Sequence, residues 1–310
     1  MKTIAASILV FLLTGLISNN FAQAAPLDSG EHEALLNGVR LHYTVSGSGP
    51  VLVLHSGGPG IDARSWGEMA GIDDFATIVL LHPRGSGLSQ DAPDGAYMLS
   101  DYAADLEALR LHLGLDQLML MGWSHGGMVA MQYAATFPQA VSRLVLYSTS
   151  AYFADFLDDI DATVQKFRDE PWFEDSYAAL QDEWNGNYSS DAELSSIVLR
   201  ELKFYFHDYD DRAAAYLDSI SDYVVRTGSL NAFNTNEAPN LDLRPLLSHI
   251  TAPTLVMAGR SDFITTAAMA EEIVRHTPRA RLVVFEQSGH FAVVEEAERF
   301  HDVVREFITE

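Results

Sequence analysis

Ser124 is the centre of a G-x-S-x-G pattern that Gly122 and Gly126 complete. This pattern places a serine hydroxyl on a sharp turn between a strand and a helix, where it can act as a nucleophile. An apolar run at 118–121 enters the turn, and a helix-forming run at 128–136 leaves it, as the motif requires. The two glycines leave room where side chains would collide. The pattern predicts a nucleophilic serine, and the alternative is a glycine-rich strand-to-helix turn without a catalytic role.

A serine hydroxyl is a weak nucleophile, so it needs an adjacent base that a third group orients. Where a serine lies on a G-x-S-x-G turn of this kind, the acid and then the histidine follow it along the chain. Asp262 lies just after the apolar run 253–258, and His290 follows the run 281–285. Gly289 permits the tight bend that would aim the imidazole inward. We predict Asp262 and His290 as the partners, against the alternatives of a helix N-cap for Asp262 and a surface loop for His290.

A developing oxyanion needs two N–H donors that are already in place. One is expected from the backbone of His125, the residue after the nucleophile. The other is expected from the loop after the apolar run 51–54, where Gly58 is our choice and Gly57 is next. A turn that only reverses the chain is the alternative for this loop. The side chain of His125 is not expected to act as the base, because adjacent residues entering a helix point in different directions.

The chain has no cysteine, which excludes a disulfide framework, a thiolate metal site and a cysteine nucleophile. Its eleven histidines show no H-E-x-x-H spacing, so no metal is expected. No G-x-G-x-x-G follows the first strand, and there is no G-x-x-x-x-G-K. The sequence therefore predicts no cofactor.

The elements that must position these residues are short strand-like segments separated by helical patterns. They lie at 51–54, 77–81, 118–121, 141–147, 253–258 and 281–285. The segment 51–54 is continuously apolar, which is typical of a strand that is buried on both faces of a parallel sheet. The fold class is therefore α/β, with helices on both faces of a mostly parallel sheet.

Other patterns define the elements around these runs. Residues 31–46 read as two strands joined at Asn37-Gly38, which is a strong hairpin signal. An amphipathic helix is expected over 100–113, with Ser100 as its N-cap and Asp105 on its polar face together with Asp101 and Glu107. Further helices are expected at about 266–275 and 294–308.

The region 151–247 is rich in aromatic and acidic residues and lacks apolar runs of the strand type. We predict that it forms a helical cap inserted into an α/β core made of residues 25–150 and 248–310. Residues 1–24 have the pattern of a secretory signal peptide: a positive Lys2, a short apolar stretch and a small-x-small cleavage site. The protein is expected to be exported, to the periplasm or the medium. A membrane anchor is the alternative, but the stretch is shorter than the roughly 20 residues that span a bilayer.

The 310-residue chain carries 43 acidic and 19 basic side chains, for a net charge of −24. This charge argues against binding to nucleic acid or to anionic membranes, where Lys and Arg must neutralise phosphates. A small molecule or a short peptide, neutral or cationic, is the expected partner.

These segments together resemble the α/β-hydrolase superfamily and, within it, the proline iminopeptidases and their relatives. The resemblance covers the chain from about Gly30 onward. The segments that carry it are 55–60 (HSGGPG), 83–87 (PRGSG), 101–115, 122–127, 241–262 and 288–290 (SGH). It implies an eight-stranded, mostly parallel sheet with a helical cap, and cleavage of an N-terminal residue, often proline, from short peptides.

The sequence departs from the family pattern at Ser56, which separates His55 from Gly-Gly-Pro-Gly, at His82-Pro83 in the second loop, and at Trp123 and His125 beside the serine. An enzyme of this type is expected to bind the substrate's free amine with cap carboxylates. The cap offers many carboxylates, and none is singled out; among them are Glu170, Glu174, Asp175, Glu183, Glu201 and Glu237.

The prediction is a serine hydrolase that works through an acyl-enzyme, with an iminopeptidase-like aminopeptidase favoured. A carboxylic ester or lactone hydrolase with the same triad is the main alternative. A lyase that uses the triad only for proton transfer and a non-catalytic small-molecule binding protein remain as further alternatives.

Overall fold

The structure is a computed structural model that describes residues 27–153 and 163–310, so the predicted signal peptide lies outside the described residues. Its eight strands form one sheet in the order β1-β2-β4-β3-β5-β6-β7-β8. In chain order the strands are β1 (Gly30–Leu36), β2 (Val39–Gly47), β3 (Val51–His55), β4 (Thr77–His82), β5 (Leu118–Trp123), β6 (Val141–Tyr147), β7 (Thr254–Gly259) and β8 (Ala280–Phe285). β1 pairs with β2 and β2 with β4 in antiparallel fashion, whereas β3 to β8 are parallel to one another. The mostly parallel sheet is confirmed.

The antiparallel edge of the sheet follows from the predicted hairpin. Asn37 and Gly38 both have positive φ, 49° and 78°, which is the conformation of a two-residue turn whose twist matches its strands. The parallel strands β3, β4, β5 and β7 are buried almost throughout, because helices cover both faces of the sheet.

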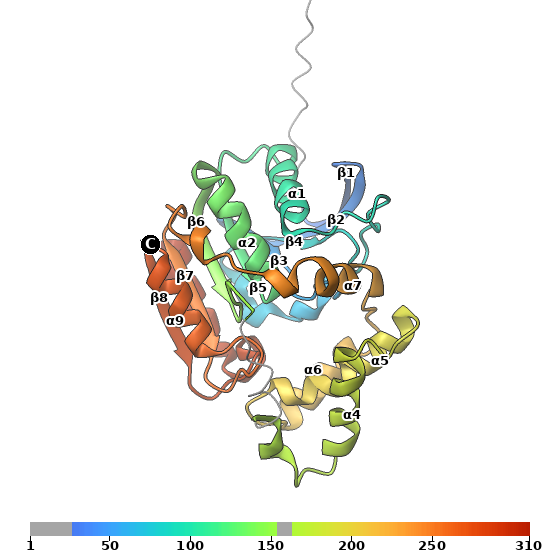
Figure 1. Cartoon of the computed structure of the whole chain (residues 1–310). Coiled ribbons are helices and arrows are strands. Elements are labelled where there is room, and N and C mark those ends of the chain that lie inside the picture. Colours follow the sequence, from blue (N-terminus) through green and yellow to red (C-terminus); the bar gives the residue numbers. More distant parts are fainter. Residues whose placement is uncertain (1–26, 154–162) are drawn as a thin grey trace, which may run out of the picture.

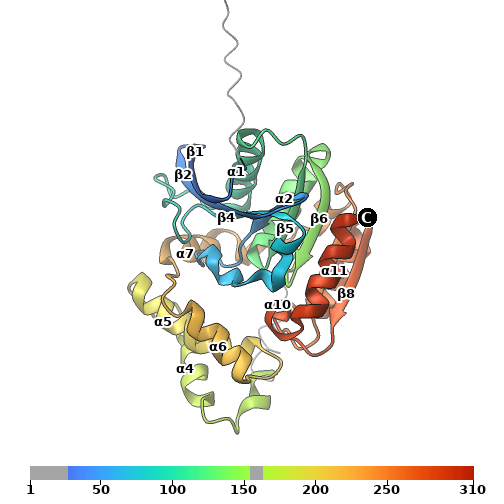
Figure 2. The same ribbon diagram turned by 180° about the vertical axis from the view of Figure 1, so that it is seen from behind.

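Helices cover both faces of the sheet, and others form a separate lobe. They are α1 (Leu99–His112), α2 (His125–Thr136), α4 (Phe173–Trp184), α5 (Asp191–Glu201), α6 (Asp211–Ile220), α7 (Thr227–Asn236), α8 (Arg244–Leu247), α9 (Ala267–His276), α10 (Ala292–Glu295) and α11 (Ala297–Thr309). Figure 1 shows α1, α2 and α9 over one face of the sheet, and Figure 2 shows α11 over the other. Each layer encloses its own apolar core. Within the described residues, no helix is long and apolar enough to cross a membrane.

The described part of the predicted insertion, residues 151–153 and 163–247, is called the cap below. It contributes no strand to the sheet, and its helices α4, α5 and α6 form a separate lobe in both views (Figures 1 and 2). A small cluster of buried side chains, including Phe204 of the cap and Phe263 of the loop after β7, joins the cap to the core. The cap therefore packs against the loops that follow the carboxyl ends of the strands.

Three sequence predictions are wrong in detail. Helix α1 begins at Leu99, with Met98 rather than Ser100 as its N-cap residue. The Asp101 carboxylate accepts a hydrogen bond from the Met98 N–H at 2.8 Å, and this bond caps the start of the helix. Asp105 is buried rather than on a polar face, since its carboxylate is paired with Arg84.

The third difference is at the C-terminus. The helix expected over 294–308 is two helices, α10 and α11, with a break at Glu296, where φ is −123° and ψ is 50°. The break turns the chain beside the loop that carries His290.

Candidate active site

Ser124 sits between β5 and α2 with φ 54° and ψ −121°, a strained conformation for a residue with a side chain. Surrounding groups hold it there. The Ser124 N–H donates to the Tyr147 carbonyl at 2.9 Å, and its carbonyl accepts from the Thr149 hydroxyl at 2.6 Å. A Cβ atom at Gly122 would overlap the carbonyl of Gly126, so the glycines of the motif permit the close approach of strand and helix.

Asp262 and His290 are brought together by the loops after β7 and β8. Oδ2 of Asp262 lies 2.7 Å from Nδ1 of His290, and both side chains are buried. The carboxylate also accepts from the N–H groups of Ile264 and Thr265, at 3.0 and 2.9 Å, and from the Thr265 hydroxyl at 2.7 Å. These bonds fix the carboxylate, which in turn orients the imidazole with Nδ1 toward Asp262 and leaves Nε2 available.

Ser124 and His290 line the same cavity, which has a volume of about 610 Å³. The His290 ring lies against Trp123, the residue before the serine, with 5.8 Å between ring centroids. In the described part of the chain, the Ser124 hydroxyl makes no direct hydrogen bond to the imidazole. Catalytic hydrogen bonds are often loose in the absence of substrate and tighten in the complex.

The loop after β3 lies beside the serine. A Cβ atom at Gly57 would be 3.3 Å from Cβ of Ser124, and Gly58 has φ 115°, a conformation that favours glycine. Gly57, Gly58 and His125 all line the cavity. The N–H groups of Gly58 and His125 donate to no carbonyl within the described residues, so they are available to a ligand.

The His125 side chain packs between two aromatic rings. Its ring lies edge-on between Tyr102 and Phe233, with centroid distances of 5.2 and 5.1 Å. Burial lowers the pKa of His125 to about 3, so the imidazole is neutral at physiological pH. Two other histidines that lie on helices, His276 at the end of α9 and His301 in α11, are not among the residues that line the cavity.

Two carboxylates of the cap, Glu183 at the end of α4 and Glu201 at the end of α5, line the cavity that holds Ser124. Glu201 is 3% exposed, and its Oε2 has no hydrogen-bond partner among the described residues. Burial raises the pKa of Glu183 to about 7. Burial, and next the nearby Glu183 carboxylate, raise the pKa of Glu201 well above its ordinary value. The cavity therefore contains an acidic pair, of which Glu201 is buried and Glu183 is half-buried.

The other acidic groups near the cavity or in the cap are already engaged or lie elsewhere. Asp62, which also lines the cavity, pairs with Arg64 at 2.5 Å. Asp175 pairs with Arg200 at 2.8 Å. Glu237 accepts from the Leu99 N–H at 2.9 Å and so holds the start of α1.

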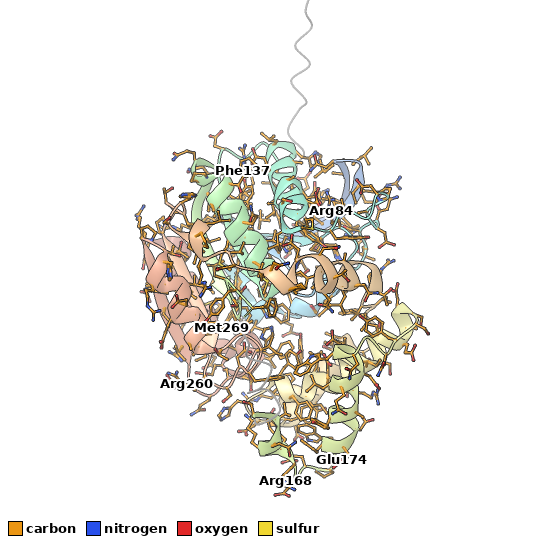
Figure 3. The ribbon with its side chains drawn as sticks, in the orientation of Figure 1. Arg84, Phe137, Arg168, Glu174, Arg260 and Met269 are labelled. Atoms are coloured by element: carbon orange, nitrogen blue, oxygen red, sulfur yellow. The ribbon has the colours of Figure 1, made fainter. Side chains whose placement is uncertain are left out.

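Figure 3 shows Glu174 together with Arg168 at the outer end of the cap. Glu170 is exposed, and neither it nor Glu174 lines the cavity. Of the six cap carboxylates considered from the sequence, only Glu183 and Glu201 reach the cavity.

The sequence contains a signal that could have singled out Glu201. The buried residues of α5 are Leu194, Ile197, Val198 and Glu201, which is helical spacing along one face. A carboxylate in line with an apolar face is expected to point inward. No comparable signal marks Glu183, whose burial depends on how α4 packs against α5.

No group of three or more His, Asp or Glu side chains within residues 27–153 and 163–310 is arranged to hold a metal ion.

The fold and the arrangement of the loops define the class of protein. The family model for the alpha/beta hydrolase fold matches residues 50–297, and the chain belongs to this family. Among curated proteins, it is 26% identical to a proline iminopeptidase of Saccharolobus solfataricus over 280 residues, which are 86% of this chain and 87% of that protein. It is also 28% identical to a 2-hydroxy-6-oxononadienedioate/2-hydroxy-6-oxononatrienedioate hydrolase of Burkholderia vietnamiensis, with 87% and 91% of the two chains covered.

A similar solved structure is the enol-lactonase of Burkholderia xenovorans. It has a TM-score of 0.69 and 26% sequence identity, and the match covers 90% of this chain and all of that one. The protein is therefore an alpha/beta hydrolase that resembles proline iminopeptidases.

Proposed function

We propose that the protein is a serine aminopeptidase that removes an N-terminal residue from short peptides or aminoacyl amides. Ser124 attacks the carbonyl carbon, and His290 takes the hydroxyl proton and gives it to the leaving amine. Asp262 orients the imidazole and stabilises the imidazolium. The N–H groups of Gly58 and His125 bind the oxyanion. Water then attacks the acyl-enzyme, with His290 again acting as the base.

The observation that carries the choice of substrate is the acidic pair of Glu183 and Glu201 in the same cavity as Ser124. Neither carboxylate forms a salt bridge to a basic side chain that the structure describes. A buried carboxylate without an ion pair is unfavourable, and a cation that enters the cavity relieves this cost. Arg200 lies near Glu201, but its guanidinium pairs with Asp175. A substrate ammonium group is the complementary ligand for the pair.

The ionisation of the pair supports this assignment. Burial raises the pKa of both carboxylates, and for Glu201 it outweighs the opposing effects of the Arg200 charge and the Tyr205 hydroxyl. The empty pair therefore holds protons more readily than ordinary carboxylates do. A bound ammonium group favours the ionised carboxylates and lowers their pKa values. We therefore expect binding of a free amine to release protons from Glu183 and Glu201.

The second candidate is a carboxylic ester or lactone hydrolase with the same triad. The similarity to the enol-lactonase, which extends over that whole chain, favours it. In this case the protonated pair would donate a hydrogen bond to a neutral substrate rather than bind a cation.

A substrate panel separates the two candidates. We propose to compare kcat/KM for a prolyl or alanyl anilide, the same compound with an acetylated amine, and a short-chain aryl ester. The aminopeptidase assignment predicts a requirement for the free amine. An equal rate on free and blocked amines, or a preference for the ester, would contradict it and support the second candidate.

We further propose that residues 1–24 direct export and are then removed. The N-terminal sequence of protein recovered from the periplasm or the medium is expected to begin at Ala25 or Pro26. Full-length protein that stays in the cytoplasmic fraction would refute this proposal.

A further inference from the structure

The cap contacts both loops that carry the proposed acid and base. The His290 N–H donates to the Tyr205 carbonyl of the cap at 2.7 Å. Two residues further along the cap, Nδ1 of His207 lies 2.7 Å from the hydroxyl of Ser261, which directly precedes Asp262. The segment 205–207 is thus hydrogen-bonded to each of the two loops.

Glu295 links this cap segment to the histidine loop a second time. Its Oε2 accepts from the Gly289 N–H at 2.7 Å, and its Oε1 accepts from the His207 N–H at 2.6 Å. One carboxylate therefore joins the residue before His290 to the cap. Glu295 does not line the cavity, so it has no direct contact with a substrate there.

The histidine loop is tightly packed against the cap segment and β7. A Cβ atom at Gly289 would overlap the Tyr205 carbonyl on one side, and a Cβ atom at Gly259 would overlap the Gly289 carbonyl on the other. The loop is therefore held between β7 and the cap. A change in the position of the cap segment must be transmitted to Gly289 and His290.

We propose that Glu295 is a positioning residue for His290, which it holds in register with Ser124 by fastening the histidine loop to the cap. This inference rests on the proposed serine mechanism for its effect on activity. Loss of the carboxylate leaves two N–H groups without their acceptor and frees the loop to shift. A displacement of about 1 Å near a reacting group can lower the rate roughly 100-fold.

Four variants test the two hydrogen bonds of Glu295, to the N–H groups of Gly289 and His207. Glu295→Gln replaces one of the two acceptor oxygens with a donor. His207→Pro removes the N–H that binds Glu295, whereas His207→Ala keeps that N–H and removes only the ring. Glu286→Gln is the charge-matched control, because Glu286 starts the same loop but pairs with Arg260 on the surface.

The first readout is the rate of labelling of Ser124 by a fluorophosphonate, which requires the serine and the histidine but no amine site. We expect Glu295→Gln and His207→Pro to lower this rate about 10- to 100-fold. The same two variants should lower kcat on the best substrate while KM changes less than twofold. Glu286→Gln should label at the wild-type rate, and His207→Ala should label faster than His207→Pro.

The second readout is hydrogen exchange across residues 287–291, which is independent of activity. Exchange should rise in Glu295→Gln and in His207→Pro but not in Glu286→Gln. Unchanged exchange together with unchanged labelling in a folded Glu295→Gln variant would overturn the positioning role. If that variant does not fold, equal exchange and labelling in His207→Pro and His207→Ala would overturn it.

Failure of the proposed serine mechanism gives a different result. In that case the wild-type protein would take no label at Ser124, while the exchange data would still decide whether Glu295 holds the loop.

Discussion

Asp262 and His290 are joined by a 2.7 Å hydrogen bond between Oδ2 and Nδ1, and the acid reaches this position from the loop after β7. Both side chains are buried, so the interaction is shielded from water and salt. The bond selects the tautomer of His290 that can accept a proton at Nε2.

Replacement of the acid should therefore act on kcat. Asp262→Asn keeps the shape of the side chain, but its amide can force the imidazole into the wrong tautomer. We expect kcat to fall by about 10³- to 10⁴-fold with a smaller change in KM. Steady-state kinetics of the purified variant provide the measurement, and circular dichroism confirms its folding. A loss of less than tenfold would remove Asp262 from the proposed triad.

Glu201→Gln tests the proposed amine site. The amide cannot pair with a cation, so we expect KM for a free-amine substrate to rise at least about 30-fold, which corresponds to about 2 kcal/mol of binding free energy. The KM for an N-acetylated or ester substrate should not rise. The matched control is Glu174→Gln at the outer end of the cap (Figure 3). Equal effects of Glu201→Gln on free and blocked amines would exclude a direct role in amine binding.

The acidic pair should also affect stability as a function of pH. Burial raises the pKa of Glu183 from 4.5 to about 7. A raised pKa in the folded state contributes stability below about pH 4.5, and this contribution is lost as the pH rises to about 7. Relative to Glu183→Gln, the free energy of unfolding of the wild type should fall between pH 5 and 8, by on the order of 1 to 3 kcal/mol.

Urea unfolding of both proteins across this pH range measures the difference. Glu174→Gln again serves as the control, and its free energy of unfolding should change with pH in the same way as that of the wild type. A constant difference between the wild type and Glu183→Gln would mean that Glu183 titrates at its ordinary pKa.

Arg84 and Asp105 form a buried ion pair with two bonds, at 2.7 and 2.6 Å. Removing one partner of such a pair leaves an uncompensated buried charge. Asp105→Ala should therefore destabilise the protein by about 3 to 5 kcal/mol. The drop should appear in urea unfolding, while kcat of the folded fraction stays near that of the wild type. A decrease below 1 kcal/mol would show that water or another group takes over the role of Asp105.

The sequence indicated those features that depend on local pattern. Ser124, Asp262 and His290 each follow a parallel strand that the sequence predicted, so one sheet edge collects all three. Of these strands, β5 and β7 are largely buried, whereas the edge strand β8 is mostly half-buried. Asp105 was misplaced because its partner Arg84 lies 21 residues away and is invisible to helical periodicity. The N-cap at Met98 was missed because a side chain three residues later, not its own, supplies the cap.

The cap was less predictable than the core. Its sequence contains many carboxylates that local pattern could not rank, and the choice of Glu183 and Glu201 required the packing of α4 against α5. The contact of Glu295 with His207 joins residues 88 positions apart, and no local spacing signals it.

The most direct test of the serine mechanism is the intact mass of the protein after treatment with a fluorophosphonate, followed by peptide mapping. The serine mechanism predicts a single adduct on Ser124 in the wild type, no adduct in Ser124→Ala, and much slower formation in His290→Ala. An unmodified wild type, or labelling that persists in Ser124→Ala, would contradict it.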